Sequence, residues 1–341
     1  MTTTAVTTVI ESTIISAKDA VLEEIAKRAP KAIDRSQRSF KSIEEATERL
    51  GKPIHETLRH IFDQPRIEQK SNEWLFARRN AITASDFGAA AGIAEWSNPV
   101  EIFKKKTETN IQPFNARSIE FMKHGEQWEN YAAHHYETVT GNTIIDFGLM
   151  VHWRIFALRP SDITRNDWLR LVTSTDRPEC IDDEKWREIC DLRWLQGSPD
   201  GITTNGILVE IKCPSTSFKP GVIRDCYMAQ VQLNMELANV DRCHFIQYRP
   251  PEGLLSEQFD FFEIARDRQW FLLQKENARK CWKWIEHFRN TGTVPQDLVK
   301  RIEKVATEDG SVQFRSLLTR KRSTSSVSRN ESDAVFRDLD C

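Results

Sequence analysis

Apolar residues recur at every second position from Ile207 to Ile211, and a shorter strand-like run covers residues 201–203. Asn205 and Gly206 lie between the two runs, and this dipeptide is typical of a tight turn. The pattern therefore predicts a β-hairpin, with side chains alternating between the two faces of each strand.

The register of this hairpin decides which face Asp200 occupies. A two-residue loop would put Asp200 and Glu210 on opposite faces. A three-residue loop over residues 204–206, with Gly206 in the left-handed region, pairs them directly. Glu210 and Lys212 share a face because they are two positions apart. We predict the three-residue loop, because only this register puts the three polar groups on one side.

Two carboxylates and an amine on one face suit a divalent metal ion. Carboxylate oxygens bind Mg²⁺, a bound metal lowers the pKa of water, and a nearby lysine can orient or deprotonate that water. These groups can hydrolyse a phosphodiester. The alternative is an ordinary hairpin whose Asp200, Glu210 and Lys212 are solvated, since the spacing alone is a short pattern.

A helical segment opens near His124 and is expected to end at Gly141. Glu129 lies at the edge of its buried face, where a carboxylate is costly unless it is paired or bound to a metal. The alternative is a surface glutamate. The expected apolar stripe comprises Phe121, Trp128, Ala132, His135 and Val139.

A second helix is predicted over residues 227–235. Its inward positions recur every four residues, at Tyr227, Val231 and Met235, and Gln230 lies with Asn234 on a neighbouring face. The Gln230 amide can bind a phosphate or a water on a metal, or it is a helix former at the surface.

Strands are predicted at residues 243–248 and 258–264, and a long helix at 267–289 follows. The expected stripe of this helix comprises Phe271, Gln274, Ala278, Cys281, Trp282 and Ile285. Helical segments that begin at Ser16 and Ser42 precede the hairpin by a long way, and Ser42 opens a capping box. Together these elements predict an α/β protein with a mixed central β-sheet flanked by helices and a helical N-terminal extension.

Six short motifs occur in order between about residues 71 and 250. They are Trp74-x3-Arg78, Thr83-Ala84-Ser85, Gly125-x3-Glu129, Ser198-Pro199-Asp200-Gly201, Glu210-Ile211-Lys212-Cys213-Pro214 and Tyr227-Met228-Ala229-Gln230-Val231-Gln232. The ordered set resembles lambda exonuclease and the YqaJ-type viral recombinases, within the PD-(D/E)XK nuclease superfamily. The resemblance implies a restriction-endonuclease-like fold, with residues 71–290 as the exonuclease domain. The pattern along the chain predicts 1–70 as the helical extension and 291–341 as a partly disordered tail.

The activity that this resemblance implies is Mg²⁺-dependent 5′→3′ digestion of one strand of linear duplex DNA, in recombination or viral genome processing. Mn²⁺ is an expected substitute for Mg²⁺. The alternatives are an endonuclease or an RNA-degrading nuclease on the same fold, or a scaffold that binds DNA ends with weak activity. The implied site consists of Glu129, Asp200, Glu210 and the Ile211 carbonyl as metal ligands, Lys212 beside the attacking water, and Gln230 near the reacting phosphate.

The family's anchor for a terminal 5′-phosphate maps onto Arg78 and Ser85. The run from Thr83 to Asp86 precedes small residues and predicts a capping box, so Ser85 would lie in the first turn of a helix, where backbone N–H groups favour an anion. The planar guanidinium of Arg78 suits a phosphate. The alternative is that Arg78 and Arg79 form a solvated charge pair.

Residues 152–196 look like an insertion relative to the family pattern. This charged segment with several tryptophans would contact DNA or another subunit, or it is a surface excursion held by tryptophan burial. In the first case it could block the family's ring-shaped trimer. The other expected partners are duplex DNA ends and a single-strand annealing protein.

Composition adds bounds on class and compartment. The 341 residues carry a formal net charge of −2, so any DNA-binding surface must be local. The 7 cysteines are irregularly spaced, which argues against a disulfide framework, a zinc site or a cysteine-held iron–sulfur cluster. Without a membrane-length apolar run or a basic leader, we expect an intracellular protein of the cytoplasm or nucleus. The Ser/Arg-rich end predicts a tail that touches nucleic acid or is only solvated.

Overall fold

The computed structural model describes residues 38–107, 116–173, 177–251 and 255–309. The predicted segment that begins at Ser16 and the Ser/Arg-rich tail beyond residue 309 lie outside this part of the chain. Within it, no helix is long and apolar enough to cross a membrane.

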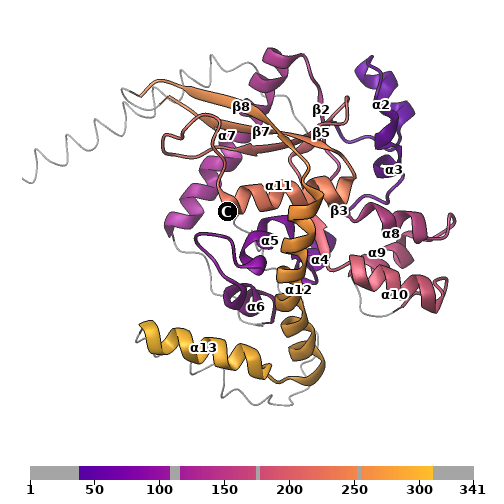
Figure 1. Ribbon diagram of the computed structural model, residues 1–341. Helices are drawn as coiled ribbons and strands as arrows, with labels where there is room; N and C mark the ends of the chain where they lie inside the picture. The colour runs from indigo at the N-terminus through magenta and orange to yellow at the C-terminus, as the bar shows by residue number, and fades with distance from the viewer. Residues whose placement is uncertain (1–37, 108–115, 174–176, 252–254, 310–341) are drawn as a thin grey trace, which may run out of the picture.

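A five-stranded mixed sheet lies in the upper half of the view in Figure 1. Its order is β2 (Ile144–Ile145), β5 (Gly201–Thr203), β6 (Leu208–Lys212), β7 (Arg242–Arg249) and β8 (Gln258–Ala265). Strands β6 and β7 run parallel, and the other neighbours run antiparallel. The predicted mixed sheet flanked by helices is therefore confirmed.

A second, three-stranded sheet was not predicted. It consists of β1 (Ile82–Thr83), β4 (Leu195–Gly197) and β3 (Met150–Val151), in the order β1-β4-β3. Strands of two or three residues leave too little alternation to be recognised from sequence. This sheet matters for the site because β1 leads directly into the Ser85 helix and β4 leads directly into Asp200.

The helices surround both sheets (Figure 1). They are α2 (Ile43–Leu50), the 3₁₀ turn η2 (Glu56–Leu58), α3 (Arg59–Phe62), α4 (Asn72–Arg79), α5 (Ala84–Ala91), α6 (Pro99–Thr107), α7 (Ala116–Thr140), α8 (Trp153–Leu158), α9 (Arg165–Thr173), α10 (Asp183–Leu192), α11 (Asp225–Ala238), α12 (Arg268–Thr291) and α13 (Gln296–Asp309). The predicted cap at Ser42 is confirmed, since its hydroxyl accepts from the Glu45 N–H at 3.1 Å. The Glu45 carboxylate returns to the N–H of Lys41, at 2.7 Å, rather than to that of Ser42.

The hairpin has the predicted register. Gly201 lies opposite Val209, and Ile202 lies opposite Leu208, so the same register continued by one residue pairs Asp200 with Glu210. Gly206 has φ 78°, a left-handed conformation that a side chain would strain.

Helices α11 and α7 cover opposite faces of the five-stranded sheet. Leu208 packs with Val231 and Met235 of α11, whereas Val209 and Ile211 pack in a cluster with Trp128 of α7. Because side chains alternate along β6, Leu208, Glu210 and Lys212 all point toward α11.

The apolar stripe predicted for α7 was partly wrong. Phe121 and Val139 are 47% and 58% exposed, and Tyr136 is buried in their place. The helix begins at Ala116 and ends before Gly141 (φ 70°). An α-helix this long extends past the strands that it covers, so the ends of its apolar stripe reach solvent.

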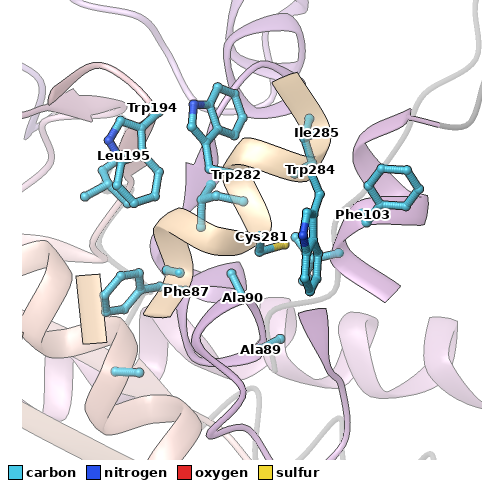
Figure 2. Close-up of a cluster of buried hydrophobic side chains, with 14 of the residues drawn as sticks. Phe87, Ala89, Ala90, Phe103, Trp194, Leu195, Cys281, Trp282, Trp284 and Ile285 are labelled. Atoms are coloured by element: carbon cyan, nitrogen blue, oxygen red, sulfur yellow. The ribbon is translucent and has the colours of Figure 1, made fainter. Parts of the chain in front are cut away.

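Helix α12 packs across α5 and α6 in a cluster of buried apolar side chains, part of which is drawn in Figure 2. Trp282 stacks on Trp194, with ring centroids 6.2 Å apart and an interplanar angle of 22°. The predicted stripe of α12 is confirmed, and Trp284 is buried beside it. This packing fixes α5, the helix that carries Ser85, against the rest of the molecule.

The segment predicted as an insertion forms α8, α9 and α10, which lie together on one side of the molecule (Figure 1). Trp168 is only 2% exposed, and it packs in a cluster with Trp74 and Ala77 of α4. Burial of Trp168 and Trp194 favours the interpretation of a packed excursion for these side chains. The same cluster holds α4, which carries Arg78.

Candidate active site

Glu210 is the most deeply buried carboxylate of the candidate site, at 1% exposure. Its Oε1 accepts from Gln230 Nε2 at 2.6 Å and lies 3.0 Å from Lys212 Nζ. Its Oε2 accepts from Asn234 Nδ2 at 3.3 Å. A carboxylate this far from water requires such donors, because burial otherwise penalises the charged form.

Asp200 lies opposite Glu210 in the hairpin, where side chains on one face are about 5 Å apart at Cβ. Its Oδ2 accepts from the Ile211 N–H at 2.6 Å. Burial raises the pKa of the Cys243 thiol, and the charges of Glu210 and Asp200 raise that pKa further. The register of the hairpin brings the two carboxylates together, and the charges of both act on the same buried thiol.

Lys212 lies on the face of β6 that carries Glu210, as predicted. Its ammonium nitrogen is 5.0 Å from the centroid of the Tyr227 ring, and its side chain is 11% exposed. The amine is thus held between a carboxylate and an aromatic face. The alternative of a solvated hairpin is wrong for Glu210 and Lys212.

Gln230 and Asn234 face the sheet from α11, and they are 4% and 0% exposed. The interpretation of Gln230 as a surface helix former is therefore wrong. Asn234 was not recognised as a site residue from the sequence. The available signal was its spacing of four residues from Gln230, which puts both amides on one face of the helix.

Glu129 is half-buried on α7, one turn before the buried Ala133. Helix α7 lies against the face of β6 that carries Val209 and Ile211. Within the part of the chain that the structure describes, no three His, Cys, Asp or Glu side chains are gathered as a metal site. The structure brings Asp200, Glu210, Lys212 and Gln230 together. Glu129 is not gathered with Asp200 and Glu210 as a group of metal-ligating side chains among the described residues.

The residues that are gathered fit a hard divalent cation. Asp200 and Glu210 supply carboxylate oxygens from paired strands, and Mg²⁺ or Mn²⁺ is commonly held by one or two carboxylates together with waters and substrate phosphates. The buried amides on Glu210 would fix the orientation of a ligating carboxylate.

Arg78 and Ser85 meet as expected, since Arg78 Nη2 donates to Ser85 Oγ at 3.2 Å. The Arg78 guanidinium also lies 4.3 Å from the Trp74 ring centroid and is 5% exposed, so the interpretation of Arg78 as a solvated charge is wrong. The predicted capping box is also wrong: α5 begins after Thr83, but the Thr83 hydroxyl donates to Asp86 Oδ2 at 2.8 Å instead of accepting from a backbone N–H. The side chain of Asp86 points back to the start of its own helix, where its carboxylate accepts the hydrogen bond from the Thr83 hydroxyl.

Asp86 is a buried anion near Arg78 and Ser85. Lys106 Nζ is 2.7 Å and Lys105 Nζ is 3.0 Å from its two oxygens. Burial opposes ionisation, but the charges of Lys105 and Lys106, a hydrogen bond from Lys106 and the charge of Arg78 together lower the pKa of Asp86 below its usual value. Three cations around one carboxylate leave local positive charge beside Ser85, which favours an anion.

Trp74 joins the two groups of residues. Its ring packs on Arg78, and its Nε1 donates to Ser198 Oγ at 2.9 Å. Ser198 is two residues before Asp200. The cationic cluster around Asp86 and the carboxylate pair are therefore connected through one side chain, although Trp74 and Glu210 are far apart in sequence.

Comparisons with known proteins place this arrangement in context. A family model described as the YqaJ-like viral recombinase domain matches residues 73–241. The uncharacterized protein R354 of Acanthamoeba polyphaga mimivirus is 22% identical over 261 residues, which is 66% of this chain. The chain spans only 40% of the length of that relative.

Two solved structures are also similar. The alkaline exonuclease of Laribacter hongkongensis is 19% identical, with a TM-score of 0.42 over 70% of this chain and 99% of that one. A phage-related exonuclease from Haemophilus somnus 129PT is 13% identical, with a TM-score of 0.37 over 62% of this chain and 96% of that one.

Proposed function

Because residues 73–241 belong to the YqaJ-like viral recombinase family, we propose that this protein is a metal-dependent exonuclease that digests one strand of linear duplex DNA from its 5′ end. The observation that carries the proposal is the position of Trp74. Its ring contacts Arg78 and its N–H donates to Ser198, which supports a phosphate site at Arg78 that neighbours the pair of carboxylates. An exonuclease that starts at a phosphorylated DNA end needs a site for the terminal phosphate and a site for hydrolysis.

In this proposal Asp200 and Glu210 hold Mg²⁺, which Mn²⁺ can replace, and the Ile211 carbonyl and Glu129 are further ligands. The assignment of Glu129 is supported by the family pattern Gly125-x3-Glu129. A divalent cation would lower the pKa of a coordinated water and offset the negative charge that builds up on the scissile phosphate.

The remaining chemistry is assigned to Lys212 and Gln230. Lys212 Nζ, held 3.0 Å from Glu210 Oε1, would orient the attacking water or take a proton from it. Gln230 uses Nε2 on Glu210, and its buried Oε1 has no hydrogen-bond partner among the described residues. That oxygen can accept a hydrogen bond from the same water, close to the reacting phosphate.

Arg78 and Ser85 would bind the terminal 5′-phosphate. The guanidinium and hydroxyl offer two donors, and the surplus positive charge of Lys105, Lys106 and Arg78 over Asp86 favours a dianion over a hydroxyl. This arrangement would favour 5′-phosphorylated ends and set the direction of digestion.

The proposed setting is recombination or viral genome processing, with duplex DNA ends as the substrate. A single-strand annealing protein is the proposed partner, because digestion of one strand exposes the other. A homo-oligomer, a trimer by family resemblance, is the proposed assembly.

The function can be tested with three DNA substrates. Purified protein with Mg²⁺ should digest 5′-phosphorylated linear duplex faster than 5′-hydroxyl duplex, and it should leave closed circles intact. Label at the 5′ or 3′ end of one strand would report the direction. Cutting of closed circles would indicate an endonuclease, preferential digestion of RNA would indicate an RNA-degrading enzyme, and binding without cleavage would indicate a scaffold.

A further inference from the structure

Two amides on α11 hold the two oxygens of a single carboxylate. Gln230 Nε2 donates to Glu210 Oε1, and Asn234 Nδ2 donates to Glu210 Oε2. The family resemblance assigned a role to Gln230 and none to Asn234. Because the two residues are four positions apart on one helix, they approach Glu210 from the same side and limit its rotation.

The oxygen of the Asn234 amide is buried without a hydrogen bond among the described residues. Asn234 is 0% exposed, and its Oδ1 has no hydrogen-bond partner among the described residues. Reversing the amide would point that oxygen at the Glu210 carboxylate and would remove the hydrogen bond. A buried polar atom without a partner is unfavourable. If packing alone mattered at this position, a leucine of similar shape would be better, so the N–H donated to Glu210 explains the amide.

Gly197 gives Asn234 the room to reach this position. A Cβ atom at residue 197 would lie 2.1 Å from Asn234 Oδ1 and 2.9 Å from Leu237 Cδ1. The need for glycine is therefore steric. Gly197 ends β4, three residues before Asp200, so Asn234 packs against the strand that leads to one carboxylate while it binds the other.

We propose that Asn234, given access by Gly197, is a positioning residue that sets the orientation of Glu210 for metal binding. The inference rests on the proposed function, because it assigns Glu210 as a ligand. Residues that orient a metal ligand commonly change metal affinity or activity by about 10–100-fold when they are replaced. Asn234 needs no contact with the metal or the DNA for this effect.

The first test is Asn234→Leu, measured by calorimetric titration of the DNA-free protein with Mg²⁺ and by thermal denaturation. We expect Mg²⁺ affinity to fall by about 10–100-fold. The Mg²⁺ concentration for half-maximal cleavage should rise in parallel. The melting temperature should fall only modestly, because the lost donor to Glu210 is partly offset by the removal of an unpaired buried oxygen.

Gln232→Leu is the matched control. Gln232 is a buried amide on the same helix, but it donates to the Ala265 carbonyl at 2.9 Å and accepts from the Asp267 N–H at 2.8 Å. Its replacement should lower the melting temperature and leave Mg²⁺ affinity unchanged. A general loosening of α11 would instead move Mg²⁺ affinity in both variants, and that result would overturn the positioning role.

Gly197→Ala tests the same role with Asn234 intact. Its added methyl group would push the amide away from Glu210, so Mg²⁺ affinity should fall as in Asn234→Leu. If the wild type binds Mg²⁺ and cuts DNA while Asn234→Leu matches it in Mg²⁺ affinity, the positioning role is refuted and the proposed function stands. If the wild type neither binds Mg²⁺ nor cuts DNA, both are overturned.

Discussion

Removal of the Asp86 carboxylate should destabilise the protein through a buried charge. Asp86 and Lys106 form an ion pair at 2.7 Å, with side chains 6% and 2% exposed. Asp86→Ala would leave the Lys106 ammonium buried without its carboxylate partner, beside the Arg78 carbonyl 2.7 Å away. Breaking a buried pair by removing one partner typically costs about 3–5 kcal/mol. Lys105 adds less, because its side chain is 31% exposed.

Thermal denaturation followed by circular dichroism would measure this loss. For a domain of this size, about 1 kcal/mol corresponds to a shift of roughly 2–4 °C, so Asp86→Ala should melt roughly 6–20 °C below the wild type. The double variant Asp86→Leu/Lys106→Met replaces the ion pair with apolar side chains and should recover most of the loss. A shift below about 2 °C for Asp86→Ala, or no recovery in the double variant, would refute the reasoning.

The pH dependence gives a second check. The folded pKa of Asp86 lies below its ordinary value of 3.8, so its contribution to stability is fully present above that value. The contribution is lost as pH falls through the lower, folded pKa. The difference in melting temperature between wild type and Asp86→Ala should therefore be constant at neutral and mildly acidic pH, and it should shrink only below the ordinary value.

Three other substitutions test single contacts of the proposed site. Lys212→Ala should lower single-turnover rates by about 10²–10⁴-fold with little change in Mg²⁺ affinity, and a loss of tenfold or less would give Lys212 a structural role. Arg78→Ala should lower the ratio of the initial rate on 5′-phosphorylated duplex to that on 5′-hydroxyl duplex, while slower hydrolysis persists. Equal wild-type rates on the two kinds of end would refute the proposed phosphate site. Trp74→Phe keeps a ring against Arg78 but removes the N–H donated to Ser198. It should slow digestion of 5′-phosphorylated ends more than of 5′-hydroxyl ends, and an equal effect on both would contradict the connection.

The hairpin was predictable because chemistry and geometry agreed on one register. Only the three-residue loop pairs Asp200 with Glu210, and Gly206 is the residue type that this loop requires. The stripe of α12 was predictable for a related reason, since a long amphipathic helix repeats its pattern over many turns.

The buried polar residues were harder to predict. Arg78 and Gln230 belong to types that are mostly exposed, so surface positions were the natural alternative for both. Their burial depends on partners distant in sequence: the Trp74 ring and Ser85 for Arg78, and Glu210 for Gln230. Periodicity does not encode those contacts, whereas the family resemblance included both residues in the expected site.

The contact of Asn234 with Glu210 and the hydrogen bond of Thr83 could not be predicted from the sequence. The role of Asn234 depends on the space that Gly197 leaves, and these two residues meet only through the packing of α11 on β4. The Thr83 hydroxyl could accept from a backbone N–H of α5 or donate to Asp86. It donates to the charged Asp86 carboxylate. The capping-box pattern alone could not show which bond would form.

We propose that Asp200 and Glu210 form the metal site of the nuclease. The most direct measurement compares Mg²⁺-dependent digestion of 5′-phosphorylated linear duplex by the wild type, Asp200→Ala and Glu210→Ala, with DNA binding measured in parallel by fluorescence anisotropy. Each substitution removes a metal ligand from a hairpin held by its own strand pairing, so both variants should lose cleavage while binding DNA nearly as well as the wild type. Near-normal Mg²⁺-dependent cleavage by either variant would contradict the assignment.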